Sequence, residues 1–153
     1  MTMINRCHLA LIAVLAGLPL LASATTVQTR YGKAETGPEG NSFALSFDGM
    51  KVSTFEGLDV DLHHVTGNGS NEYLIVDNFL PGLHCRHQFS VLEISPAGMT
   101  ALSKPFGKCT ELEGAEYLAD GVVVQTRSPS VEGKKKQKLG TYKWSKGILA
   151  EQR

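Results

Sequence analysis

The sequence predicts an all-β protein: an antiparallel meander of about five hairpins that forms a sandwich or a small barrel with one disulfide. Three observations support this class. No segment of helical length keeps the 3.6-residue apolar period of an amphipathic helix. Short runs rich in Val, Phe, Tyr, Thr and Leu recur between turns that contain glycine. The turn glycines stand at positions 49, 69, 98, 121 and 147, one for each predicted hairpin.

The first segment, residues 1–24, has the layout of a cleaved signal peptide. A basic residue precedes an apolar run over residues 9–21, and the small residues Ala22-Ser23-Ala24 end it. A membrane anchor is the alternative, but the run contains a proline and is shorter than the ~20 residues of a spanning helix. We expect a periplasmic or secreted protein with no stable membrane anchor after cleavage, in which residues 25–153 form a single β domain.

The charge of the chain is balanced, with 15 basic and 15 acidic side chains. Cleavage of the leader removes Arg6 and leaves the mature chain close to neutral. A near-neutral protein has no overall field that draws it to polyanions, so we expect no nucleic-acid partner.

The first part of the domain contains one clear hairpin. A short strand is expected over residues 26–31, and the run 32–41, rich in Gly, Glu and Pro, is expected to be an exposed loop. Residues 43–47 alternate apolar and small side chains, Asp48-Gly49 suits a tight turn with positive φ, and residues 50–53 form the return strand.

Four further hairpins follow the same pattern of strand, turn and return strand. The predicted pairs are 59–65 with 73–76, 87–95 with 99–103, 115–119 with 122–126, and 141–144 with 148–150. A small propeller-like meander of the same hairpins is the alternative to a sandwich or barrel.

Cysteine usage predicts the disulfide. Cys7 leaves with the leader, so Cys85 and Cys109 remain, and two cysteines in an exported chain allow a single intramolecular pairing. Redox or metal chemistry by the two thiols is the alternative, but their spacing is far from Cys-x-x-Cys. In the loop-entropy account such a bond stabilises the fold by about 3.5 kcal/mol.

The histidines of the domain cluster in one stretch, as His63, His64, His84 and His87. If the fold joins them, they would bind Zn²⁺ or Cu²⁺, with Asp59 or Asp61 as an oxygen ligand. Adjacent residues of a strand point to opposite faces, which argues against one ion bound by both His63 and His64. Ordinary hydrogen-bonded histidines without any cofactor, or a response to pH near neutrality, are the alternatives.

A basic run follows the fourth hairpin and comprises Lys134, Lys135, Lys136 and Lys138. As a solvated hairpin tip it would keep the protein soluble and resist pairing of strand edges. As a binding feature it would attract an acidic partner or an anionic envelope polymer.

Catalytic motifs are missing from the sequence. It contains no Gly-x-Ser-x-Gly, no His-Glu-x-x-His and no glycine loop of the kind that binds phosphate. We therefore expect no catalytic residues and no enzymatic activity.

Two short sequence segments around the cysteines resemble segments of other proteins. Residues 81–85 (Pro-Gly-Leu-His-Cys) precede the strand 89–94, and residues 105–109 (Pro-Phe-Gly-Lys-Cys) follow it. Within residues 72–150 the chain resembles uncharacterised small exported β-rich proteins of Gram-negative bacteria. In those proteins a Gly-x-x-Cys motif is followed later in the chain by a Phe-Gly-x-Cys motif. The resemblance implies a periplasmic setting and a structural bond between Cys85 and Cys109.

These observations lead to two functional hypotheses. The first is a periplasmic binding protein of the inhibitor or immunity kind, whose loops on a disulfide-linked β scaffold bind an envelope protein. The second is a periplasmic metal-binding protein that uses the histidine cluster.

Overall fold

The computed structural model describes residues 24–82, 85–129 and 138–152. The predicted signal peptide lies outside these residues, apart from Ala24. Within the described residues the chain forms strands and turns, and no helix has the length and apolar character needed to cross a membrane.

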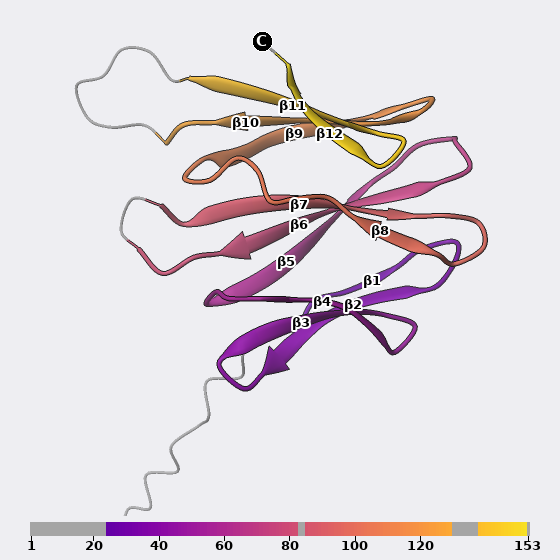
Figure 1. The fold of residues 1–153 in the computed structure, drawn as a ribbon, viewed down its shortest axis with the longest axis horizontal. Coiled ribbons are helices and arrows are strands. Elements are labelled where there is room, and N and C mark those ends of the chain that lie inside the picture. Colours follow the sequence, from indigo (N-terminus) through magenta and orange to yellow (C-terminus); the bar gives the residue numbers. More distant parts are fainter. Residues whose placement is uncertain (1–23, 83–84, 130–137, 153) are drawn as a thin grey trace, which may run out of the picture.

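Three four-stranded antiparallel sheets make up the fold (Figure 1). The first sheet comprises β1 (Thr26–Gln28), β2 (Lys33–Glu39), β3 (Ser42–Phe47) and β4 (Met50–Phe55). The middle sheet comprises β5 (Asp59–Val65), β6 (Glu72–Phe79), β7 (His87–Ile94) and β8 (Thr100–Leu102). The third sheet comprises β9 (Glu111–Leu118), β10 (Gly121–Arg127), β11 (Leu139–Ser145) and β12 (Ile148–Gln152).

Each sheet is a meander whose strands pair in chain order. The all-β antiparallel prediction is therefore confirmed, and the five predicted hairpins correspond to β3–β4, β5–β6, β7–β8, β9–β10 and β11–β12. The turn at Asp48-Gly49 has positive φ at both residues, 47° and 77°. This backbone matches the right-handed twist of the strands that it joins.

A sixth hairpin, β1–β2, corrects the prediction of an exposed loop over residues 32–41. β2 pairs with β3 from Ala34 to Glu39, and its Ala34 and Thr36 side chains are buried. The Thr36 hydroxyl donates a hydrogen bond to the Val60 carbonyl oxygen, 2.8 Å away. Pro38 is tolerated because β1 pairs with β2 only as far as Glu35, so Pro38 has a strand on one side alone.

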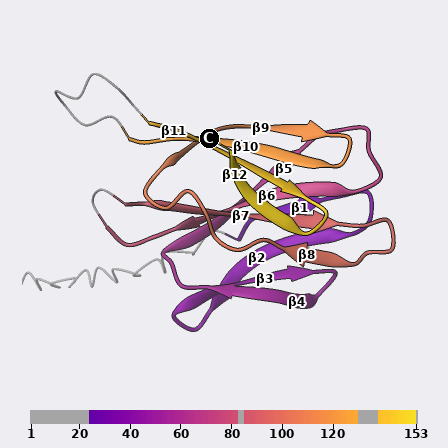
Figure 2. The same cartoon turned by 45° about the horizontal axis from the view of Figure 1, so that its top comes forward.

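The three sheets stack face to face, and the middle sheet is covered on both faces (Figure 2). One apolar core lies between the first and middle sheets and contains Leu45, Phe47 and Leu92. The other lies between the middle and third sheets and contains Phe89, Val122 and Trp144. The sheets pack as in a sandwich that has gained a third layer, and they form no closed barrel in the described part of the chain.

The disulfide joins Cys85, in the connection before β7, to Cys109, just before β9, with their Cα atoms 4.0 Å apart. The predicted pairing is confirmed, and it is consistent with an oxidising, exported compartment. The Cys109 backbone N–H donates a hydrogen bond to the His87 carbonyl oxygen at 2.9 Å. The bond therefore lies where the middle sheet meets the third sheet.

The six hairpin turns lie at one end of the stack, which we call the tip end (Figure 1). The connections that lead from one hairpin to the next lie at the opposite end, together with the disulfide. This division follows from antiparallel pairing in chain order, which returns every second connection to the same end. Loops from all three layers consequently meet at the tip end.

Candidate functional site

The β5–β6 loop at the tip end is held by both neighbouring sheets. From the first sheet, Arg30 Nη2 donates a hydrogen bond to the Gly69 carbonyl oxygen at 2.9 Å, and the Tyr31 hydroxyl donates one to the Ser70 carbonyl oxygen. From the third sheet, the Tyr117 hydroxyl donates to the Asn71 carbonyl oxygen at 2.8 Å. The loop is therefore fixed in place before any ligand arrives.

The Arg30 side chain reaches this loop because a buried carboxylate holds it. Glu72, which is 5% exposed, accepts hydrogen bonds from the Arg30 backbone N–H at 2.6 Å and from its Nε at 2.9 Å. Burial acts to raise the pKa of Glu72, but the bonds from Arg30 outweigh it and hold that pKa below its ordinary value. An ion pair thus links the first sheet to the middle sheet beside the loop.

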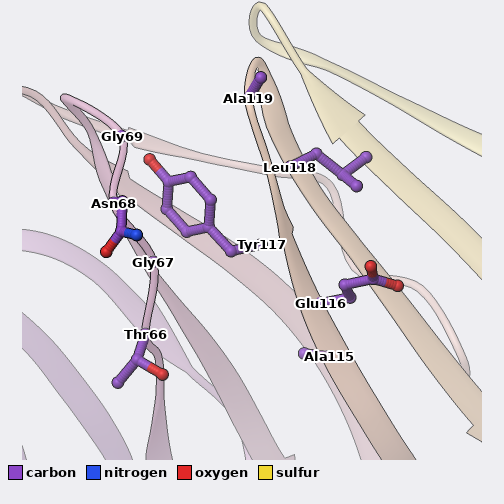
Figure 3. Close-up of a pocket in the computed structure, with 9 residues that line it drawn as sticks. All are labelled: Thr66, Gly67, Asn68, Gly69, Ala115, Glu116, Tyr117, Leu118 and Ala119. Atoms are coloured by element: carbon purple, nitrogen blue, oxygen red, sulfur yellow. The ribbon is translucent and has the colours of Figure 1, made fainter.

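The Tyr117 ring lies against the β5–β6 loop at two glycines (Figure 3). A Cβ atom on Gly67 would lie 2.0 Å from Tyr117 Cγ, and one on Gly69 would lie 2.0 Å from the Tyr117 hydroxyl oxygen. Any larger residue at either position would collide with the ring. The two glycines therefore allow an aromatic ring from the third sheet to contact the backbone of the middle sheet.

Two hollows adjoin Tyr117. The larger, which we call the tyrosine groove, has a volume of about 720 Å³ and is lined by residues 66–69 and 115–119 (Figure 3). The smaller, which we call the Glu93 pocket, has a volume of about 280 Å³. The lining of the Glu93 pocket comprises Ser70, Asn71, Tyr73, Glu93, Tyr117, Ala119, Asp120 and Lys146.

The buried side of the Glu93 pocket combines a carboxylate with aromatic rings. Glu93 accepts hydrogen bonds from Asn71 Nδ2 and, at 2.6 Å, from Trp144 Nε1. The Tyr73 and Tyr117 rings meet edge to face with their centroids 5.4 Å apart. Burial raises the pKa of both phenols, and the negative charge of Glu93 adds to the rise, so both phenols remain neutral.

Two charged residues line the exposed side of the Glu93 pocket, Asp120 and Lys146. Asp120 accepts a hydrogen bond from the Ser145 hydroxyl at 3.0 Å and lies 3.5 Å from Lys143 Nζ. The bond from Ser145, followed by the charge of Lys143, lowers the pKa of Asp120, which is ionised at neutral pH.

The predicted histidine cluster is divided between the two faces of the middle sheet. Asp77 lies 3.0 Å from His87 Nδ1 and 3.8 Å from His63 Nε2, on the face toward the third sheet. His64 lies on the opposite face, with its Nε2 3.6 Å from Glu72 Oε1. His84 lies outside the described residues.

The histidines that share Asp77 have different surroundings. The His87 ring packs against Phe79, with ring centroids 4.4 Å apart, and stacks on Phe89. His63 is 41% exposed at its side chain, yet its Nε2 atom is buried and has no hydrogen-bond partner among the described residues. Interaction with the Asp77 carboxylate raises the pKa of His63, although burial opposes the rise. Nowhere in the described residues do three or more His, Cys, Asp or Glu side chains form a group that fits a metal ion.

The basic run lies largely beyond the described part of the chain. Lys134, Lys135 and Lys136 fall outside it, and Lys138 immediately precedes β11, where its carbonyl oxygen accepts a hydrogen bond from the Ser128 N–H at 2.9 Å. The start of β11, which follows Lys138, lies at the end of the stack opposite the tip end (Figure 1).

Tyr73, Glu93 and Tyr117 were not among the site residues predicted from the sequence. A signal for Glu93 was present, because it is a charged residue between two apolar residues, Leu92 and Ile94, in the strand predicted over residues 87–95. No comparable signal marks Tyr117, since its role depends on glycines about fifty positions earlier in the chain. No family model, curated protein or solved structure matches this chain, so the site is interpreted from its own geometry.

Proposed function

We propose that this protein is an exported binding protein, of the inhibitor or immunity kind, that binds an envelope protein at the tip end. The observation that carries the proposal is the β5–β6 loop, which is tied to Arg30 and Tyr31 on one side and to Tyr117 on the other. A loop fixed in advance loses little conformational entropy when a partner binds.

The shape of the tip end supports the same function. The tyrosine groove, at about 720 Å³, falls within the range of volumes that binding pockets occupy. An aromatic ring with a polar end, such as Tyr117, is among the side chains that contribute most at protein interfaces. Loops on a rigid scaffold are the usual location of binding residues.

Two glycine variants test the proposal. In Gly67→Ala the added methyl group would overlap the Tyr117 ring, so the ring must move. Gly114→Ala adds the same group on β9, where it meets no other part of the described structure within 4 Å. Mature wild-type protein and both variants are used for affinity capture from envelope extract in the presence of chelator. We expect wild type and Gly114→Ala to retain one stoichiometric partner and Gly67→Ala to lose it.

Substitution of the basic run tests the alternative binding surface. If replacement of Lys134, Lys135, Lys136 and Lys138 by Gln abolishes capture while Gly67→Ala keeps it, the partner binds through the basic run and the proposal is wrong. If the wild-type protein captures the partner without chelator but loses it when chelator is present, the result would instead favour metal handling.

Metal binding by His63, His64, His84 and His87 is the second candidate. One observation favours a smaller set: His63 Nε2 and His87 Nδ1 both face the Asp77 carboxylate, and the described part of the chain offers His63 Nε2 no hydrogen-bond partner. The position of His64 on the other face weighs against the full set. Calorimetric titration with Zn²⁺ and Cu²⁺ decides the matter, because the absence of saturable binding at micromolar concentrations would end this candidate.

A further inference from the structure

We propose that the Glu93 pocket binds a primary ammonium group, carried by a lysine side chain of the partner or by a free small amine. This inference rests on the proposed function, because the Glu93 pocket adjoins the tyrosine groove and shares Tyr117 with it.

The charge of Glu93 is the first argument. Its two hydrogen bonds come from Asn71 and Trp144, which are neutral donors, and none of the described Lys, Arg or His side chains forms an ion pair with it. A carboxylate has about four acceptor sites, so capacity remains for a further donor. A partly buried carboxylate without a cation is costly, and a cationic ligand would relieve that cost.

The aromatic walls are the second argument. The Tyr73 and Tyr117 rings border the same pocket as the carboxylate, and both phenols stay neutral at physiological pH. Aromatic faces attract cations, and the recognition of ammonium ligands is an established use of this attraction. The volume of about 280 Å³ suits a head group and a few methylene groups rather than a large ligand.

The residues on the exposed side set the selectivity. Glu93 and Asp120 contribute two negative charges to the lining and Lys146 one positive charge. Lys146 forms no ion pair with either acid within the described chain. Its charge opposes a cationic ligand, so replacement of Lys146 by Gln is expected to tighten binding of an ammonium ligand.

Trp144 supplies a direct measurement, because it is the single tryptophan of the chain and its indole N–H donates to Glu93. Its fluorescence is followed during titration with n-butylammonium, n-butanol and butyrate at constant ionic strength. We expect a saturable change with butylammonium and binding at least about tenfold weaker for the other two, since one bond to a charged group accounts for that factor. Equal responses to butylammonium and butanol would overturn the proposal without any variant.

Matched variants locate the site. Glu93→Gln keeps the size of the side chain and removes its charge, and we expect it to weaken butylammonium binding by about tenfold or more. Glu111→Gln makes the same change at an exposed position at the start of β9 and should leave the affinity unaltered. Unchanged affinity in a folded Glu93→Gln protein, or weaker binding in Lys146→Gln, would contradict the proposal.

A final comparison separates the two sources of the ammonium group. A lysine side chain that enters from the partner would extend its backbone into the tyrosine groove, so N-acetyl-lysine amide should bind more tightly than butylammonium, and Gly67→Ala should remove that advantage. Equal affinities identify a free small amine as the ligand. If no ammonium ligand binds while Gly67→Ala still loses the captured partner, the inference fails and the proposed function stands.

Discussion

Tyr117 is the residue on which the tip end depends most. Its hydroxyl fixes the Asn71 carbonyl oxygen, its ring meets Tyr73, and it borders both hollows. Gly67 and Gly69 allow this position only because they lack side chains. Binding geometry and stability are therefore coupled at the β5–β6 loop.

Gly67→Ala is expected to lower the free energy of unfolding by about 2 kcal/mol, because the ring must move and the hydrogen bond to Asn71 is lost. Urea denaturation followed by Trp144 fluorescence measures the change. Gly114→Ala should stay within about 0.5 kcal/mol of wild type, since its methyl group meets open space. Equal loss in the two variants would show that the contact with Tyr117 does not contribute to stability.

His63 is expected to titrate above its ordinary pKa of 6.5, chiefly because of Asp77 and to a smaller extent because of Asp61. Because the pKa of His63 is higher in the folded than in the unfolded protein, its protonation stabilises the fold. This contribution is fully present below about pH 6.5 and is lost as the pH rises through the folded pKa. His63→Gln should therefore be less stable than wild type near pH 5.5, and the difference in stability should narrow as the pH rises through the folded pKa of His63.

Proton NMR titration of the imidazole checks the direction of the shift. Asp77→Asn should lower the pKa of His63 more than Asp61→Asn does, because Asp77 is the larger cause. A His63 pKa at or below 6.5 in the wild-type protein would contradict the prediction.

At the scale of elements, turn chemistry located the five hairpins but not the first one. Asp48-Gly49 and the later glycine turns are local signals that a sequence displays. β2 lacks such a signal, because Gly37 and Pro38 disfavour strands and β2 is held instead by pairing with β3 and by the bond from Thr36 to β5. The Glu93 pocket was missed for a related reason, since β9 meets the paired strands β6 and β7 there only through packing between sheets.

The link between the β1–β2 turn and β6 provides an element-scale prediction. Arg30→Met leaves the Glu72 carboxylate buried without its cation, so we expect a less stable protein at pH 7. The lowered pKa of Glu72 contributes stability that is present above about pH 4.5 and is lost as the pH falls through the folded value. The difference between wild type and Arg30→Met should thus shrink under acid conditions.

Lys33→Met is the matched control for this variant, because its ion pair with Glu35 lies on the surface with both side chains at least one-third exposed. Such pairs contribute little to stability. Thermal melts of the three proteins across pH 3–7 measure the effect, and an equal loss in both variants would show that burial of Glu72 is unimportant.

At the scale of the whole molecule, the middle sheet organises the fold. It contributes to both cores, and seven consecutive residues of β6, from Glu72 to Asn78, are buried. The first and third sheets each depend on it, whereas they share no core with one another. Stability of the third layer therefore rests on its contact with β5–β8 and on the covalent link beside that contact.

Loss of the disulfide should weaken this contact more than the rest of the stack. Cys85 and Cys109 are 24 positions apart, and opening a ring of that size costs about 3.5 kcal/mol in the loop-entropy account. The mature double variant Cys85→Ser/Cys109→Ser should lose about that much stability in urea, and reduced wild type should match it. The rate of hydrogen exchange should increase most over β9–β12, because Cys109 lies two residues before the start of β9. Faster exchange confined to β1–β4 would instead mean that the disulfide supports a layer that it does not touch, and would contradict the three-layer account of stability.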